Sequence, residues 1–119
     1  MSLKIEVTGI DKLVKTLSQM EAMKEPVAEA MELSLEKVVT DAKAIVPVRT
    51  GTLQRSIMFS GGEGEYTVGS RVNYAPFVEY GTSRMRPQPF LTPALLWNVS
   101  ALKEALLDIV GDWLRRRGE

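Results

Sequence analysis

The stretch PVAEAMELSLEKVVTDAKAIVP, residues 26–47, decides how the rest of the chain can fold. Apolar side chains recur in it at steps of three and four: Val27, Met31, Leu35, Val38, Ala42 and Ile45. That spacing predicts an α-helix with one continuous apolar stripe. Pro26 suits the first turn, because its missing N–H would have no partner there, and Pro47 closes the helix. We expect a helix of about 20 residues, roughly 30 Å long.

An acidic row lies on another face of the same helix. Glu29, Glu32 and Glu36 are three or four residues apart, so they lie above one another on the helix surface. Glu25 and Glu29 also bring negative charge to the positive end of the helix dipole. Such a row is commonly a solvated face, and a strip that binds a partner is the alternative. Both interpretations stay open.

Two shorter elements are expected before this helix. Residues 3–8 alternate apolar and polar side chains, which predicts a strand with one buried face. Asp11 is suited to cap a short helix after it. The apolar side chains of that short helix recur at helical spacing: Leu13, Val14, Leu17 and Met20.

A β-hairpin is expected after the long helix. Residues 56–60 and 66–72 alternate apolar and polar side chains, which predicts two strands. The glycine-rich sequence GGEGE between them predicts a flexible connector. It does not fit a phosphate-binding loop, because a strand follows it where such a loop needs a helix and a Lys-Ser/Thr pair.

The last element reads as a second long helix. Thr92 is suited to cap it and Pro93 to its first turn. Its apolar stripe is Leu95, Val99, Leu102, Leu106, Ile109 and Trp113. Residues 115–117 are all arginine, at the negative end of the helix dipole, where cations are favoured.

The order strand, helix, helix, hairpin, irregular segment, helix predicts an α+β fold. We expect a small antiparallel sheet packed against the two long helices, plus the short N-terminal helix. The 119 residues fit one domain, residues 1–119. A small sheet leaves unpaired edges, which either charged residues protect or another subunit covers.

Composition excludes several kinds of protein. The chain has no cysteine and no histidine, which excludes disulfides, thiolate or imidazole metal sites and an imidazole base. Fifteen basic residues balance fifteen acidic ones, so no global positive field attracts nucleic acid or anionic lipid. No membrane span or signal peptide is visible, and we expect a cytoplasmic chain.

Catalytic motifs are also missing from the sequence. The serines lie outside any GxSxG turn, and the acids of the GGEGE segment sit on glycine-rich backbone that could hardly hold two carboxylates at a fixed separation. Calcium-loop and zinc spacings are absent. We therefore expect no enzyme, no cofactor and no metal.

Two local signatures remain. The first is PVRTGTLQRSI, residues 47–57, in which Arg49 and Thr50 can tie down a turn and Gly51 allows a positive φ. Leu53 and Ile57 then return to the core.

The second signature is NYAPFVEYGTSRMRPQPFLTPAL, residues 73–95. We expect residues 74–80 to form a short helical turn that Gly81 ends, after which the prolines direct the chain into the last helix. The residues alone leave open whether this segment is a well-packed loop or an interaction surface.

Taken together, the two signatures and the VGS strand between them resemble the neck and tail-completion proteins of long-tailed bacteriophages. Order and spacing match over roughly half of the chain. The matching positions are Pro47, Arg49, Thr50, Gly51, Leu53, Ser56, Val68, Gly69, Tyr74, Ala75, Glu79, Gly81, Thr82, Pro89, Phe90, Pro93, Ala94 and Leu95.

The resemblance implies a non-enzymatic structural protein of a phage or prophage. Such a protein joins head to tail or completes the tail end, as a subunit of a homo-oligomeric ring around the passing DNA. Its partners would be other virion proteins: the connector or head-closure protein, the tail terminator or the tail tube. It would assemble in the host cytoplasm, as a monomer or a ring, and remain in the neck or tail of the virion without contacting a membrane.

Two further expectations concern the signatures. The aromatic side chains of the second should divide between the core and an intersubunit contact: Tyr74, Phe77, Tyr80 and Phe90. Arg49 and Glu79, the charged members of the two motifs, are expected to pair.

The alternative function is a small nucleic-acid-binding or regulatory module. It would use Arg84, Arg86 and the arginines at 115–117. DNA binding with a steep salt dependence would favour it over a tail protein. A hydrolase is a third class, and it would need turnover that one serine or acid controls.

Overall fold

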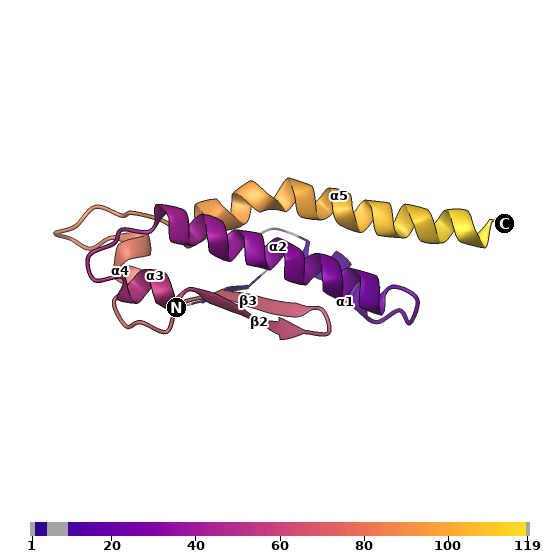
Figure 1. Cartoon of the computed structure of the whole chain (residues 1–119), viewed down its shortest axis with the longest axis horizontal. Helices are drawn as coiled ribbons and strands as arrows, with labels where there is room; N and C mark the ends of the chain where they lie inside the picture. The colour runs from indigo at the N-terminus through magenta and orange to yellow at the C-terminus, as the bar shows by residue number, and fades with distance from the viewer. Residues whose placement is uncertain (1, 5–9, 119) are drawn as a thin grey trace.

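The computed structural model describes residues 2–4 and 10–118 (Figure 1). The helices are α1 (Asp11–Ser18), α2 (Lys24–Ile45), α3 (Thr52–Ser56), α4 (Ala75–Tyr80) and α5 (Leu91–Arg117), and the strands are β1 (Ser2–Lys4), β2 (Met58–Gly62) and β3 (Glu65–Gly69). The molecule is elongated, with extents of 61 × 21 × 20 Å. The predicted α+β fold, with a small antiparallel sheet and two long helices, is confirmed.

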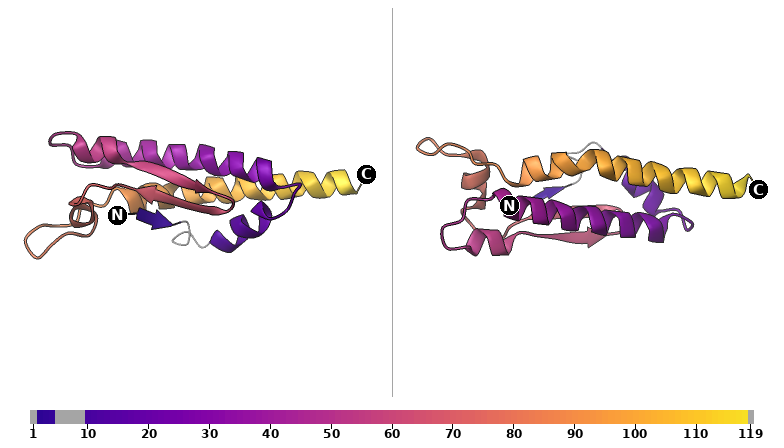
Figure 2. Two further views of the ribbon diagram at one scale, coloured as in Figure 1. Left: turned by 90° about the horizontal axis from the view of Figure 1, so that it is seen from below. Right: turned by 45° about the horizontal axis from the view of Figure 1, so that its top comes forward.

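The two long helices lie side by side and run in opposite directions (Figures 1 and 2). The stripe predicted for α2 is buried at every position except Ile45, which lies at the end of the helix and is 39% exposed. In α5, Leu95, Leu102 and Leu106 are buried, and the other positions of its stripe, Val99, Ile109 and Trp113, are half-buried. The last turns of α5 project beyond the body (Figure 1). Among the described residues no helix combines the length and apolarity needed to cross a bilayer.

The sheet has the order β1-β3-β2, and both strand pairs are antiparallel. The hairpin turn is shorter than expected: only Glu63 and Gly64 form it, with φ of 53° and 90°, as the tightest hairpin turns require. A Cβ on Gly64 would lie 2.8 Å from Cα of Lys15, so α1 packs directly against this tip. Of the strand expected over residues 3–8, positions 5–8 lie outside the described residues.

Three predicted boundaries are wrong. Ser56 belongs to helix α3 and not to the first hairpin strand, and the second hairpin strand ends at Gly69 rather than at residue 72. Asp11 does not cap α1: it lies in the first turn, where its charge still favours the helix dipole.

The core consists of two buried clusters beneath α2 and α5. One joins α1, the N-terminal half of α2 and the middle of α5 around Tyr66 of β3. The other joins the C-terminal half of α2 to α3, α4 and the start of α5 around Val68. Phe59 of β2 packs against both clusters. Because Tyr66 and Val68 point to the same face of β3, both helices cover that face.

A polar link joins the two long helices. The Nδ2 group of Asn98 in α5 donates to Oδ2 of Asp41 in α2 at 2.9 Å and to the carbonyl oxygen of Ala94 at 2.7 Å. Lys37 lies 3.3 Å from the same Asp41 carboxylate. The hydrogen bond from Asn98 lowers the pKa of Asp41 below its ordinary value of 3.8, and Lys37 adds to this effect, so that together they outweigh partial burial.

We therefore expect the stabilising effect of Asp41 to depend on pH. A carboxyl group whose pKa is lower in the folded state adds stability above its unfolded pKa, and that stability is lost as the pH falls through the folded value. Wild type should be more stable than Asp41→Asn at pH 7, and the difference should shrink below about pH 4. Urea unfolding of both proteins at pH 7 and pH 3 measures this. Asp108→Asn, at an exposed position of α5, is the control, and a difference for Asp41→Asn that is equal at both pH values would contradict the expectation.

Candidate assembly surface

The first signature folds as a tight turn that leads into α3. Gly51 has a φ of 83°, as predicted, and a contact of 3.0 Å joins the hydroxyl groups of Thr50 and Thr52 on either side of it. The arginine that supports the turn is Arg55, whose Nη1 donates to the carbonyl oxygen of Thr50 at 3.4 Å. Arg49, which we expected in that role, is exposed.

Helix α3 is fixed to its surroundings on both sides. Leu53 and Ile57 are 4% and 2% exposed, so the predicted return to the core is confirmed. Gln54 donates to the carbonyl oxygen of Lys43 at 2.9 Å, which ties α3 to the end of α2. The hydroxyl groups of Ser56 and Ser70 lie 2.5 Å apart, which ties α3 to the segment after β3. The helix of the first signature is therefore held both to α2 and to the segment after β3.

The second signature begins with α4, the predicted short helical turn. Its Glu79 is 3% exposed, and its carboxylate caps α5. Oε1 accepts hydrogen bonds from the N–H groups of Phe90 at 3.2 Å and Leu91 at 2.9 Å, and Oε2 accepts one from Thr92 at 3.3 Å. These are N–H groups that the first turn of a helix leaves without an intrahelical partner.

This cap corrects two predictions. The cap of α5 is not Thr92: the helix begins at Leu91, and a side chain from α4 supplies the acceptors. The expected pair between Arg49 and Glu79 is also wrong, since no ion pair joins them within residues 10–118. Both carboxylate oxygens of Glu79 are already committed to the backbone of α5.

Residues 82–89 form an exposed arm that projects at the same end of the molecule (Figure 1). Gly81 opens it with a φ of 79°, and a Cβ there would lie 2.8 Å from the nitrogen of Pro87. The backbones of Thr82 and Met85 exchange two hydrogen bonds of 2.9 and 3.3 Å. The N–H of Gln88 donates to the carbonyl oxygen of Val78 at 2.8 Å, so the arm returns to α4.

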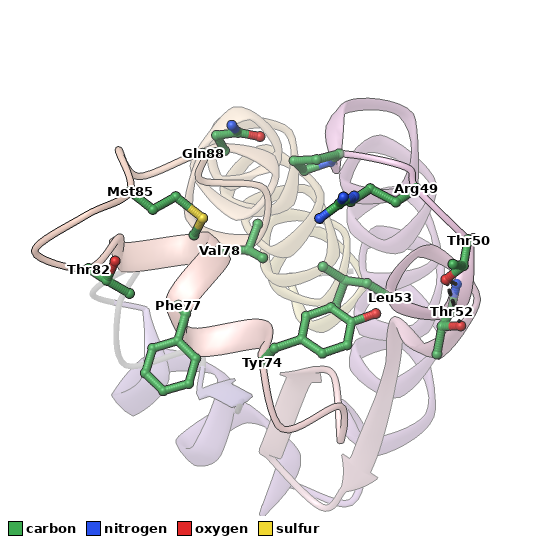
Figure 3. A pocket seen from close by; sticks show the side chains of 12 residues that line it. Arg49, Thr50, Thr52, Leu53, Tyr74, Phe77, Val78, Thr82, Met85 and Gln88 are labelled. Atoms are coloured by element: carbon green, nitrogen blue, oxygen red, sulfur yellow. Dashed lines mark hydrogen bonds between the residues drawn. The ribbon is translucent and has the colours of Figure 1, made fainter.

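The two signatures enclose one pocket of about 880 Å³, open to solvent (Figure 3). Apolar side chains from α3, α4 and the arm form most of its wall, and the guanidinium group of Arg49 points toward its interior (Figure 3). The residues that line it are Pro47, Arg49, Thr50, Gly51, Thr52, Leu53, Tyr74, Phe77, Val78, Thr82, Met85 and Gln88. Segments more than 20 positions apart in the sequence therefore form a single surface.

The structure separates the family-motif residues into two groups. Seven line the pocket: Pro47, Arg49, Thr50, Gly51, Leu53, Tyr74 and Thr82. The other eleven lie outside it: Ser56, Val68, Gly69, Ala75, Glu79, Gly81, Pro89, Phe90, Pro93, Ala94 and Leu95. Two residues of this second group, Ala75 and Phe90, are fully buried in the core cluster that also contains the pocket residue Leu53.

Sequence reasoning left five lining residues out of the motif set: Thr52, Phe77, Val78, Met85 and Gln88. One signal was available for Met85, an apolar side chain between Arg84 and Arg86 in a proline-rich segment. The aromatic side chains divide as expected with respect to the core: Phe90 is fully buried, whereas Tyr74, Phe77 and Tyr80 are 40%, 55% and 60% exposed. Whether those three contact a neighbouring subunit stays a prediction.

The pocket has a mainly apolar lining, and Arg49 is its one charged lining residue. Within residues 10–118, no group of three acidic side chains is arranged to hold a metal ion. The nearby carboxylate, Glu79, is buried in the α5 cap and is not a pocket-lining residue. An apolar wall with an arginine beside it is suited to bind an apolar side chain that has a negative charge next to it.

The first signature and the beginning of the second also lie within a match to a known protein family. Residues 10–81, more than half of the chain, match the family model described as "Bacteriophage HK97-gp10, putative tail-component". The match includes the whole first signature and the second as far as Gly81. No curated protein and no solved structure matches the chain.

Proposed function

Because the chain belongs to the HK97-gp10-like family of bacteriophage tail components, we propose that it is a structural virion protein that acts at the head-tail junction or the tail end. In this proposal it is a subunit of a ring. The observation that carries the proposal is the convergence of both signatures on one exposed, mainly apolar pocket at one end of an elongated molecule. Exposed apolar surface of this kind marks a contact with another protein.

The motif residues cap a helix, form turns and link segments, which supports a structural role rather than a catalytic one. Glu79 caps a helix, Gly51 and Gly81 permit left-handed backbone, and Ser56 joins two segments. Each of these positions shapes the pocket without adding a nucleophile or a base to it. The signatures are thus suited to hold a docking surface in a fixed form.

The partners we propose are other virion proteins. In a ring at the neck or tail end, neighbouring subunits touch one another through different surfaces, and the two open faces of the ring contact the connector or head-closure protein and the tail terminator or tail tube. DNA passes through such a ring as cargo. Assembly would take place in the host cytoplasm.

The experiment is a deletion of this chain in the phage that encodes it. We expect DNA-filled heads and separate tails under the electron microscope, no plaques, and recovery of joined particles when the chain is supplied from a plasmid. Supplying the Phe77→Ser variant, which alters an exposed pocket residue, should restore few joined particles. Tails that join heads normally without the chain would contradict the proposed role.

The structure gives a reason to rank the nucleic-acid alternative second. Arg84 and Arg86 lie on the arm, whereas the arginines at 115–117 lie at the far end of α5, so the two groups cannot form one continuous patch (Figure 1). At that far end, Arg115 pairs with Asp112, and the Arg117 guanidinium lies 5.0 Å from the ring centre of Trp113. The alternative requires duplex DNA binding with a steep salt dependence, which is measured by fluorescence anisotropy.

A further inference from the structure

The end of the molecule that carries the pocket is strongly basic although the whole chain is neutral. Residues 42–62 and 66–103 contain one acidic residue, Glu79, and it is buried. The exposed arginines of that end are Arg49, Arg55, Arg71, Arg84 and Arg86. None of them forms an ion pair with a described residue. The pocket is therefore an apolar hollow with unpaired positive charges around it.

The acidic row of α2 has the opposite character. Glu29, Glu32 and Glu36 are all exposed, as is Glu25 at the start of the helix, and none of the four forms an ion pair with a described residue. Beside the row lies Leu33, which is 61% exposed and has Glu29 one turn before it and Glu36 one turn after it. Lys37 also lies one turn after Leu33 but is paired with Asp41, so Leu33 has unpaired carboxylates beside it and a lysine that is already paired.

The two surfaces of one molecule cannot meet each other. Leu33 is twelve residues before the end of α2, about 18 Å along the helix axis, and the pocket lies past that end. The pocket opens to solvent, and the glutamates of the row and Leu33 are exposed. Unpaired opposite charges on different parts of one molecule favour contact between two copies.

We propose that the basic pocket binds the acidic face of α2 from a second copy of this chain, with Leu33 inserted between α3, α4 and the arm. Glu29 and Glu36 of that copy then approach Arg84 and Arg86. The contact uses a different surface on each copy, so every subunit keeps one free pocket and one free acidic face, and the chain of contacts can close into a ring. This inference rests on the proposed ring function.

The pocket itself favours a protein partner over DNA. A phosphate backbone offers charge to the arginines but no apolar group to fill a hollow lined by Leu53, Phe77 and Met85. Leu33, among glutamates, supplies both the apolar group and the charge. The matched pair of surfaces on the same chain therefore identifies the second copy as the occupant.

A charge exchange tests the contact directly. We expect Arg84→Glu/Arg86→Glu and Glu29→Arg/Glu36→Arg each to weaken self-association at least about tenfold, because like charges then face one another. Combining all four substitutions in one chain should restore it. Sedimentation velocity across a concentration series, at low and at high salt, gives the dissociation constants, and wild-type association should weaken with salt. Glu104→Arg/Asp108→Arg, on exposed positions of α5, is the matched control and should leave association unchanged.

Cross-linking detects the contact even where association is weak. The chain has no cysteine, so a Leu33→Cys copy mixed with a Met85→Cys copy can form only the disulfides that the substitutions introduce. We expect a heterodimeric disulfide to form at least about tenfold faster than in a mixture of Leu114→Cys with Met85→Cys. Leu114 is the control because its exposed fraction, 57%, is close to the 61% of Leu33, and it lies on the projecting part of α5.

Three results would overturn the inference. The first is failure of the fourfold variant to restore association, together with equal cross-linking rates for the Leu33→Cys and Leu114→Cys variants. The second is loss of DNA binding, with unchanged self-association, in Arg84→Glu/Arg86→Glu, which would make the pocket end a nucleic-acid site. The third is that the wild type forms rings and none of these substitutions changes ring formation. This result would reject the interface but would not contradict the proposed tail function. Normal head-tail joining in the deletion phage would reject that function.

Discussion

Replacing Phe90 with alanine should lower the free energy of unfolding by about 3–5 kcal/mol, the range for a large buried aromatic side chain. Phe90 is fully buried, and it lies where the arm meets α5, in the cluster that joins α2, α3, α4 and α5. Removing its ring would leave a cavity in this fully buried cluster. Urea unfolding followed by circular dichroism measures the loss.

Phe77→Ala is the matched control, because Phe77 belongs to the same signature but is 55% exposed. It should cost less than about 1 kcal/mol. Equal losses for the two variants would mean that Phe90 does not hold this end of the molecule together. The same pair separates stability from assembly, since Phe77 lines the pocket and Phe90 does not.

Glu79→Gln should lower the free energy of unfolding by about 1.5–3 kcal/mol, the range for hydrogen bonds to a buried charged group. The amide keeps the size of the side chain but replaces one oxygen by a donor, which would face the N–H groups at the start of α5. It also removes the negative charge from the positive end of the helix dipole. Thermal and urea unfolding give the magnitude.

The control for this substitution is Glu104→Gln, on an exposed turn of α5, which should change stability by no more than about 0.5 kcal/mol. Hydrogen exchange adds a local test. In Glu79→Gln, the amides of Phe90, Leu91 and Thr92 should exchange faster, because their acceptors are weakened. Unchanged exchange at these three amides would contradict the cap.

The elements that could be predicted from the sequence are those whose structure depends on residues close to one another along the chain. The stripe from Val27 to Ala42 repeats every three or four residues, so it defines a helix and its buried face without reference to the rest of the chain. The hairpin and the turn at Gly51 were also predictable, since both depend on glycine at positive φ.

What could not be predicted depends on contacts between distant segments. The cap of α5 comes from Glu79, eleven to thirteen residues before its partners, whereas the usual cap signal concerns the residue next to the helix. Pairing Glu79 with Arg49 by charge alone failed because the helix terminus attracts the same carboxylate. The pocket also needs the arm to turn back onto Val78, which no local pattern indicates.

The proposed role depends on the claim that this chain is a structural component of the virion. Quantitative mass spectrometry of purified, infectious particles tests it most directly, with the portal protein as internal standard. We expect the chain at a constant ratio to the portal protein, corresponding to one ring in each particle, and retained after the particles are washed in high salt. Infectious particles that contain no detectable copy of the chain would contradict the claim.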